Sequence, residues 1–497
     1  MAGDLGRGLP QGHVFRTTII AMHVAQEMGL DAPSQADVFY TSLLVHAGCT
    51  AGAPQFAAFV ASDDLLAQRE LCLCDPTNTM DILRWMRRNV APGASLPKRL
   101  QRVFYLMTHE AEFSSEFDGG SSDVGSRIAK RLGMPDAVQE SLYHICETWS
   151  GKGPHKLRGT AIPLAARVVN GSMVAEVLVT EYGPERAVKA ILSRQGKSLD
   201  PGVANALCKV AARDVLLESQ EEDLWPTVLA LEPRPTREAE SLDAICEALA
   251  DFIDLKSPDV TAHSRATAAL AEAVARIMGL PAEERVLVRR AALVHDLGLV
   301  AVPTQLLSKT RTPMEEERHR THPYYTHHIL SRVPALRDIA SVAAMHHERL
   351  DGTGYHLGLR ATDLPLAGRI LAVADAYQEV QAQRSPPGSR DGKSALEVVQ
   401  LEAGQGLDAH CVAALALALE SLKEQRAPRG AYPVGLTERE VDVLRLAAQA
   451  LTVREMAKQL VVSEATVRHH LEHIYDKLDV SSRAGAVLFA AENGLLG

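Results

Sequence analysis

Seven residues in the second half of the chain are candidate metal ligands, because their side chains are of types that commonly bind metal ions. They lie in or beside apolar stretches such as LVHDLGLVAVP (293–303), where a polar group buried without a partner is costly. Imidazole and carboxylate ligands suit iron, manganese or zinc, and a carboxylate can bridge two ions. No cysteine is among them, which argues against a structural zinc site. The set is His263, His295, Asp296, His322, His346, His347 and Asp375.

An eighth candidate ligand, Asp259, follows from helix geometry. Ser257 and Pro258 have the composition of a helix start, a capping residue followed by proline. A helix that begins there would place Asp259 and His263 four residues apart on one face. The helix dipole alone also favours an aspartate in a first turn, so both interpretations of Asp259 stay open.

The first part of the chain repeats the pattern of the second. Three blocks recur in the same order: residues 12–30 align with 262–280, 43–48 with 292–298, and 147–169 with 348–371. This order predicts a tandem duplication of one helical fold. A solenoid is not indicated, because the period is far longer than that of solenoid repeats.

The two copies differ at the candidate ligands. The first copy lacks the groups needed for the same metal centre, so we expect it to be a structural or sensory partner. Its residues at the positions of Asp296, His346, His347 and Asp375 are Ala47, Ile145, Cys146 and Met173.

The motifs VHDLG (294–298), THP (321–323), MHHERLDGTGY (345–355) and ILAVADAY (370–377) resemble those of HD-GYP domains, a branch of the HD metal-dependent phosphohydrolases. The resemblance covers residues 241–424. It implies an all-helical domain that binds two or three ions, usually iron or manganese, and hydrolyses cyclic di-GMP. The metal ligands that it implies are Asp259, His263, His295, Asp296, His322, His346, His347 and Asp375, with Asp296 as the catalytic residue that bridges the metals.

The loop after the histidine pair is the implied ligand-binding segment. Its glycines suit a close backbone approach, and an arginine beside it offers a planar fork for phosphate. Its residues are Arg349, Asp351, Gly352, Gly354 and Tyr355. Two positions depart from the family, since Leu299 replaces a lysine or arginine and His356 replaces a proline. Because the lost cation would leave charge unstabilised in the transition state, we expect hydrolysis to be slow or absent.

The last part of the chain has the pattern of short, capped helices. Thr437 and Glu440 form a capping-box signature, Ser463 suits the N-cap of a later helix, and the short turn between two helices matches helix-turn-helix spacing. Residues 436–496 resemble the LuxR-type helix-turn-helix domain. The resemblance places Thr466, Arg468 and His470 on or near DNA and Lys477 toward its backbone, while Arg454 and Lys458 could add phosphate contacts.

Composition limits the other possibilities. The 497 residues carry a net charge of −10, so a nucleic-acid partner requires a local site. Basic and acidic residues are equal in number over 426–497, so one copy should bind DNA weakly and we expect a homodimer. The seven cysteines form no CxxC pair, which indicates reduced thiols. Lacking an apolar run of about 20 residues, the chain is expected to be cytoplasmic, with no membrane partner.

Together these patterns predict an all-α protein with two HD-type domains and a DNA-binding domain. The expected parts are a degenerate HD-like domain (1–225), a linker (226–240), an HD-GYP-like domain (241–425), a linker (426–435) and a LuxR-type domain (436–497). The leading hypothesis is a bacterial transcription regulator that binds a cyclic dinucleotide. The alternatives are a cyclic di-GMP phosphodiesterase whose helix-turn-helix serves dimerisation, and a catalytically inactive receptor for another small ligand.

Overall fold

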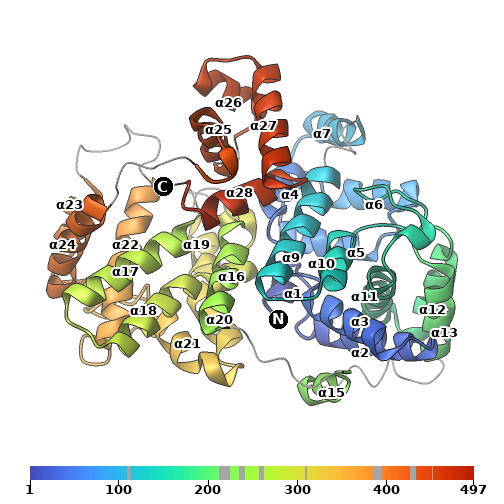
Figure 1. The fold of residues 1–497 in the computed structure, drawn as a ribbon, viewed down its shortest axis with the longest axis horizontal. Helices are drawn as coiled ribbons and strands as arrows, with labels where there is room; N and C mark the ends of the chain where they lie inside the picture. The colour runs from blue at the N-terminus through green and yellow to red at the C-terminus, as the bar shows by residue number, and fades with distance from the viewer. Residues whose placement is uncertain are drawn as a thin grey trace. The chain divides into compact units, whose positions relative to one another are not determined.

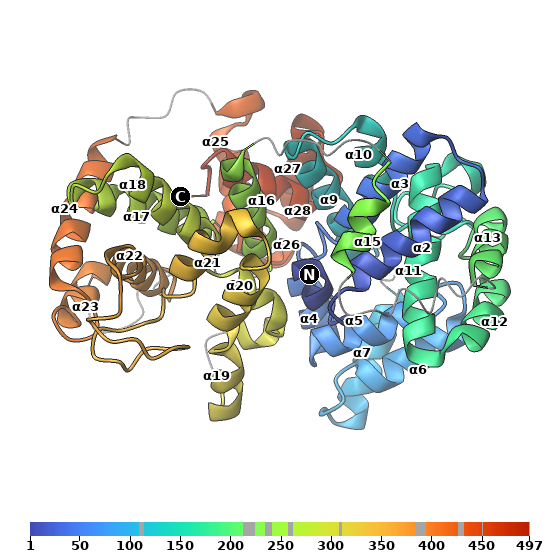
Figure 2. The same ribbon diagram turned by 90° about the horizontal axis from the view of Figure 1, so that it is seen from below.

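A computed structural model of the chain describes residues 1–108, 114–211, 224–233, 241–256, 262–307, 311–383, 394–425, 432–449 and 451–496. Within these ranges the chain forms helices and no β-strand (Figures 1 and 2), which confirms the all-α fold class. The chain divides into two compact units, Gly3–Glu240 and Ser241–Leu478, and the residues after Leu478 are divided between them. None of the described helices is long and apolar enough to cross a membrane.

In the first unit, helix α2 packs against α3, α11 and α13. Ile20, Met22 and Leu178 are buried in the resulting core. The helices are α1 (Ala2–Gly6), α2 (His13–Glu27), α3 (Ala32–Leu44), α4 (Ala53–Val60), α5 (Asp64–Leu73), α6 (Thr79–Asn89), α7 (Leu96–Thr108), η1 (Ser115–Gly119), α9 (Gly120–Arg131), α10 (Asp136–Tyr143), η2 (Gly159–Ala161), α11 (Leu164–Tyr182), α12 (Pro184–Arg194), α13 (Pro201–Ala211) and α15 (Trp225–Ala230).

In the second unit, helix α17 packs against α18, α22 and α24. The helices are α16 (Leu242–Asp254), α17 (His263–Ile277), α18 (Ala282–Val294), η4 (Leu297–Ala301), η5 (Thr304–Leu307), α19 (Pro313–His319), α20 (His322–Leu330), η6 (Pro334–Leu336), α21 (Arg337–Ala343), α22 (Leu366–Gln383), α23 (Ala395–Leu401), α24 (Ala409–Gln425), η7 (Pro433–Gly435), α25 (Glu438–Ala448), α26 (Val453–Leu460) and α27 (Glu464–Leu478). The last helix, α28, spans Arg483–Glu492.

The two units share one hydrogen-bonding arrangement around a buried glutamate. The Glu147 carboxylate accepts hydrogen bonds from the backbone N–H groups of His155 at 2.6 Å and Leu157 at 3.1 Å. Glu348 of the second unit does the same for Leu357 at 2.7 Å and Leu359 at 2.8 Å. In both units a buried carboxylate thus organises the loop that follows it, as expected for two copies of one fold.

The stretch expected to be the first linker begins with a helix instead. In α15 (Trp225–Ala230), Val228 is buried and the helix packs against α2. Pro226 lies in the first turn, where its missing N–H costs no hydrogen bond, so this proline does not break the helix. Residues 234–240 and 426–431 of the expected linkers lie outside the described residues.

Candidate functional site

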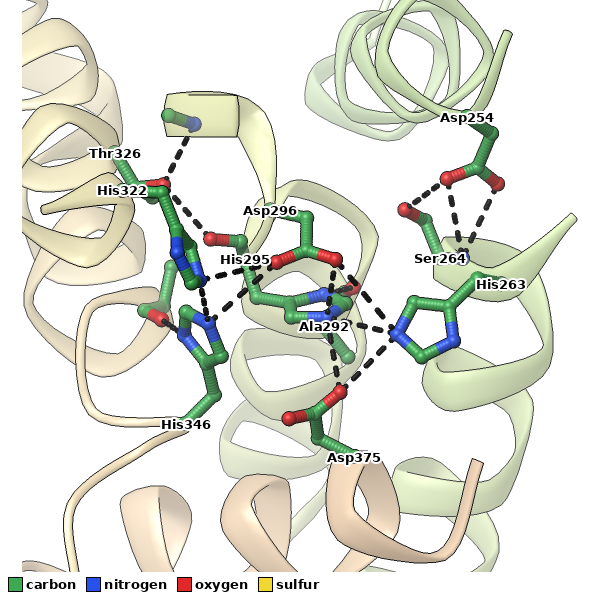
Figure 3. A network of polar contacts seen from close by, with 12 residues as sticks. Asp254, His263, Ser264, Ala292, His295, Asp296, His322, Thr326, His346 and Asp375 are labelled. Atoms are coloured by element: carbon green, nitrogen blue, oxygen red, sulfur yellow. Dashed lines mark hydrogen bonds and ion pairs between the residues drawn. The ribbon is translucent and has the colours of Figure 1, made fainter. Parts of the chain in front are cut away.

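Seven of the eight candidate ligands converge at one place in the second unit, and the ends of helices supply most of them. Figure 3 labels these residues except His347. His263 is the first residue of α17, His295 and Asp296 follow α18, and His322 is the first residue of α20. His346 and His347 follow α21, while Asp375 lies within α22. The eighth candidate, Asp259, lies outside the described residues.

The Asp296 carboxylate lies between two pairs of histidines (Figure 3). Its Oδ2 atom is 3.4 Å from Nε2 of His295 and 3.8 Å from Nε2 of His263. Its Oδ1 atom is 3.5 Å from Nε2 of both His322 and His346. Each oxygen faces its own pair of imidazoles, which is the arrangement required of a carboxylate that bridges two ions.

Asp375 adds a second carboxylate to one of these pairs. Its Oδ1 atom is 3.1 Å from Nε2 of His263 and 3.2 Å from Nε2 of His295, and these two nitrogens are 3.3 Å apart. Its Oδ2 atom is buried and has no hydrogen-bond partner, which is costly unless a cation or proton lies beside it.

Backbone carbonyls orient three of the imidazoles. The Nδ1 atoms of His295, His322 and His346 each lie 2.7 Å from the carbonyl oxygen three residues earlier. If Nδ1 carries the proton and donates it to that carbonyl, Nε2 keeps a lone pair that points toward Asp296. Outer hydrogen bonds of this type fix the tautomer and orientation of metal-binding histidines.

The charges in this cluster shift its pKa values strongly. Burial acts to raise the pKa of Asp296, but the neighbouring His295 and His346 outweigh it and hold this pKa well below its usual range. Burial acts to lower the pKa of His295, but the Asp296 and Asp375 carboxylates raise it to about 10. Burial lowers the pKa of His322 to about 3. Asp296 is therefore ionised at neutral pH, as metal binding requires, whereas His295 would release its proton when a metal ion binds.

The sequence did not reveal Glu379 as part of this cluster. Ligand atoms of His347, Asp375 and Glu379 all lie within 4.8 Å of one another. Burial and the Asp375 charge raise the pKa of Glu379 to about 8. The one available signal was its spacing, since Asp375 and Glu379 are four residues apart in a helix and share a face. Oxygen and imidazole donors crowded around an unpaired carboxylate oxygen fit divalent ions such as manganese or iron.

The turn after Asp296 is held by a buried lysine. Lys256 is 1% exposed, and its Nζ donates hydrogen bonds to the carbonyl oxygens of Leu299 at 2.9 Å, Val300 at 2.7 Å and Val302 at 2.7 Å. A Cβ atom on Gly298 would lie 1.9 Å from the His322 carbonyl oxygen, so this position requires glycine. Leu299 itself is buried.

Most residues of the loop that was expected to bind a ligand form hydrogen bonds within the loop or determine its backbone conformation. Arg349 donates to the carbonyl oxygens of His346 and Glu348, and Asp351 accepts hydrogen bonds from Thr353. Gly352 has φ +79°, and a Cβ on Gly354 would lie 2.4 Å from the Arg349 nitrogen, so both glycines shape the loop. Tyr355 is the loop residue that reaches the cluster, since its ring stacks on His347 with centroids 4.6 Å apart.

The first unit lacks this cluster at the equivalent positions. His13 and His46 remain stacked with ring centroids 5.5 Å apart, but Glu176 pairs with His13 and with Arg16 instead of facing both histidines. A separate group, His144, Glu147 and His155, has ligand atoms within 4.8 Å.

The C-terminal helices form as expected. Thr437 and Glu440 make the complete capping box of α25, and Ser463 accepts a hydrogen bond from the Thr466 N–H at 3.1 Å before α27. One stripe of α27 is buried, consisting of Val467, Leu471, Ile474 and Leu478.

The candidate DNA-binding residues differ in their surroundings. Arg454, Lys458 and Arg468 are exposed, while Thr466 and His470 are partly exposed. Lys477 is already paired, because its Nζ donates to both carboxylate oxygens of Glu440 at 2.9 and 2.8 Å. The expected contact of Lys477 with the DNA backbone would therefore compete with this internal ion pair.

Two known protein families match separate segments of the chain. Residues 247–411 match the HD domain family, and residues 434–490 match the luxR family of bacterial regulatory proteins. The 3'3'-cGAMP-specific phosphodiesterase 3 of Vibrio cholerae is 28% identical over 430 residues, which cover 85% of this chain and 93% of the relative. The cyclic di-GMP phosphodiesterase response regulator RpfG of Xanthomonas campestris is 30% identical over 256 residues, covering 48% of this chain and 66% of the relative.

A solved structure has the same fold. The crystal structure of a cyclic GMP-AMP specific phosphodiesterase from V. cholerae aligns with 84% of this chain and 95% of its own, with a TM-score of 0.56 and 24% identity. The chain therefore combines an HD domain, whose relatives are HD-GYP cyclic nucleotide phosphodiesterases, with a C-terminal domain of the luxR family.

Proposed function

We propose that this protein is a transcription regulator in which residues 241–425 bind divalent ions and a cyclic dinucleotide, and residues 436–497 bind DNA as part of a homodimer. The observation that carries the metal proposal is the position of Asp296, with one oxygen facing His263 and His295 and the other facing His322 and His346. The relatives support a cyclic dinucleotide, either cyclic di-GMP or 3'3'-cGAMP, as the ligand.

The proposed chemistry is hydrolysis of a phosphodiester. Bound divalent ions would lower the pKa of a water molecule and offset the phosphate charge. Asp296 and Asp375 would hold the ions, while the backbone-anchored imidazoles keep their Nε2 atoms in place. Tyr355, stacked on His347, would border the substrate. Because Leu299 provides no cation at its position, turnover is expected to be slow.

DNA control requires that the ligand prefer one arrangement of the domains. Arg468, exposed on α27, and Thr466 at its first turn are the side chains proposed to reach base edges or phosphates. Arg454 and Lys458 on α26 would contact phosphates beside them.

The test uses the full chain, freed of metal and reloaded with Mn²⁺ or Fe²⁺. Hydrolysis of cyclic di-GMP and 3'3'-cGAMP is followed by chromatography, and DNA binding is measured on duplexes selected from a random pool, with and without each dinucleotide. Asp296→Asn should lose bound metal and turnover, whereas the control Asp338→Asn, on the exposed start of α21, should keep both.

Each possible outcome separates the hypotheses. Turnover together with ligand-dependent DNA binding supports the proposal. Turnover with DNA binding that ignores the ligand favours a phosphodiesterase whose helix-turn-helix serves dimerisation. Ligand-dependent DNA binding without turnover favours an inactive receptor. Absence of any effect of either dinucleotide on metal-loaded protein would remove the proposed ligand.

A further inference from the structure

A separate group of possible metal ligands lies in the first unit, at the end of α10 and in the loop that follows it. Ligand atoms of His144, Glu147 and His155 all lie within 4.8 Å of one another. None of these residues is among the eight ligands that the sequence motifs implied, and the group lies in the copy that has Ala47 at the position of Asp296. It therefore requires an explanation of its own.

The loop backbone holds the Glu147 carboxylate in place. Its side chain is 0% exposed, and its oxygens accept the N–H groups of His155 at 2.6 Å and Leu157 at 3.1 Å. Because each carboxylate oxygen has a second lone pair, it can also bind a cation. Oε1 of Glu147 lies 3.4 Å from Nδ1 of His155, so two possible ligand atoms are already neighbours.

The two imidazoles each have a buried nitrogen without a hydrogen bond. Nδ1 of His144 and Nδ1 of His155 have no hydrogen-bond partner, unlike the three second-unit imidazoles that backbone carbonyls orient. The Tyr143 ring positions both, because it stacks on His155 with centroids 4.3 Å apart and meets His144 edge-on at 4.9 Å. Buried nitrogens without partners are costly, and a bound cation removes that cost.

The distances and ligand types suit zinc. Two ligand atoms that lie 2.0–2.1 Å from a tetrahedral zinc ion are about 3.3–3.4 Å apart, which matches the distance between Glu147 Oε1 and His155 Nδ1. A small rotation of the partly exposed His144 ring brings the third ligand into range. Two imidazoles and one carboxylate form a zinc site with its fourth position left to water, which reaches the partly exposed His155.

The second unit provides an internal comparison. The N–H of Glu147 donates to the carbonyl oxygen of His144 at 3.2 Å, and the N–H of Glu348 donates to that of Met345 at 2.9 Å. His144 and Met345 therefore occupy equivalent positions, and the methionine offers no imidazole there. The first copy has a complete group of three ligands where the second copy has only Glu348 and His356.

We propose that His144, Glu147 and His155 bind one zinc ion in the first unit, with water as the fourth ligand. The ion joins the end of α10 to the loop after Glu147. This site is independent of the metal binding proposed for residues 241–425. In the competing role, His155 is a protonated imidazole that pairs with Glu147, and no metal is required.

His144→Met tests the site and should fold, because the second unit has methionine at the equivalent position. His155→Gln is a second test variant, and His410→Gln, which removes a 92% exposed imidazole, is the control. The full chain is stripped of metal and equilibrated with Zn²⁺ against a chromophoric chelator of known affinity. Bound zinc is counted by mass spectrometry, and circular dichroism reports whether each variant folds.

Every variant is made both in the wild-type chain and in Asp296→Asn, because the second unit can bind zinc as well. In both backgrounds, the chain without further change and His410→Gln should bind one more zinc ion than His144→Met and His155→Gln do. The affinity for this ion should fall about 100-fold or more, since losing a ligand costs at least as much as losing an outer hydrogen bond to one.

Two results would overturn the zinc site. The same zinc count and affinity in folded His144→Met and His155→Gln would assign the group to ion pairing without metal. Loss of an ion only in the chain that retains Asp296 would place that ion in the second unit.

The zinc site and the proposed function fail separately. If Asp296→Asn loses ions while His144→Met binds as many as wild type, the zinc site alone is wrong. If Asp296→Asn binds as many ions as wild type while His144→Met loses one, the zinc site stands and the metal centre of the proposed function is wrong.

Discussion

The guanidinium carbon of Arg320 lies 4.4 Å from the centre of the Tyr355 ring, and the same ring stacks on His347 with centroids 4.6 Å apart. The Tyr355 ring thus contacts both the exposed Arg320 guanidinium and the candidate metal ligand His347. Since Leu299 offers no charge, Arg320 would be the cation that attracts a phosphate of the proposed dinucleotide.

Arg320→Gln should therefore weaken substrate binding. We expect the KM for a cyclic dinucleotide to rise about tenfold, the effect of losing one charged hydrogen bond, with the bound metal content unchanged. Steady-state kinetics on metal-loaded protein measures this change. Arg318→Gln, another exposed arginine two residues earlier, is the matched control and should leave KM unaltered.

Leu299→Lys tests whether a missing cation limits turnover. Placing an ammonium at this position should raise kcat by about tenfold or more, because developing phosphate charge would gain a partner. Turnover is measured in the same assay, with metal content as a check on the site. Because Leu299 is buried, Leu299→Met serves as the control for a change of shape without charge. An unchanged kcat in a folded, metal-loaded lysine variant would contradict the prediction.

The contribution of Asp254 to the free energy of unfolding of the second unit should decrease as the pH rises. Burial raises the pKa of this carboxyl to about 7, although hydrogen bonds from Ser264 act in the opposite direction. The unfolded value is about 3.9, so the folded state binds the proton more tightly. The stabilising contribution is complete below pH about 4 and disappears as the pH rises through about 7.

Asp254→Asn should remove this part of the pH dependence while preserving an oxygen that accepts from Ser264. Urea unfolding of metal-free protein between pH 5 and 8 measures the effect for each variant, and a chelator prevents metal binding from adding its own pH dependence. Asp338→Asn should follow wild type. A wild-type curve as flat as that of Asp254→Asn would rule out the shifted pKa.

Substitution of Arg468 should mainly weaken DNA binding, whereas substitution of Lys477 should mainly lower stability. Arg468 is 63% exposed, so Arg468→Ala should weaken DNA binding by about 1–3 kcal/mol with little change in the melting temperature. Lys477 is paired with the buried Glu440, so Lys477→Met should lower the melting temperature of the C-terminal domain. Fluorescence anisotropy and calorimetry measure the two properties. A strong loss of affinity with unchanged melting in Lys477→Met would restore its expected role at DNA.

The candidate metal cluster was largely predictable because its residue types are diagnostic. Histidine and aspartate beside apolar helices have few stable roles without a partner, and the motifs supplied their order along the chain. The helix caps at Thr437 and Ser463 were predictable for a related reason, since capping depends on residues only three positions apart.

Residues whose partners are distant in sequence were not predictable. A glutamate such as Glu379 on a helix usually faces solvent, and only the approach of His347 from another segment makes it a candidate ligand. Lys477 meets Glu440, which is 37 positions earlier, and no local pattern records that pairing. Residues 226–240 were expected to form a linker, because the sequence did not show that Pro226 would lie in the first turn of a helix.

The Lys256 ammonium donates hydrogen bonds to the carbonyl oxygens of Leu299, Val300 and Val302. The segment after α16 is therefore part of the structure that holds the turn after Asp296. A recombinant fragment that starts at His263, the first candidate ligand described, would omit this lysine and leave three carbonyl oxygens without their donor. Such a truncation would be expected to misplace Asp296 even though it retains every described histidine of the cluster, so expression boundaries for this domain belong before Leu242.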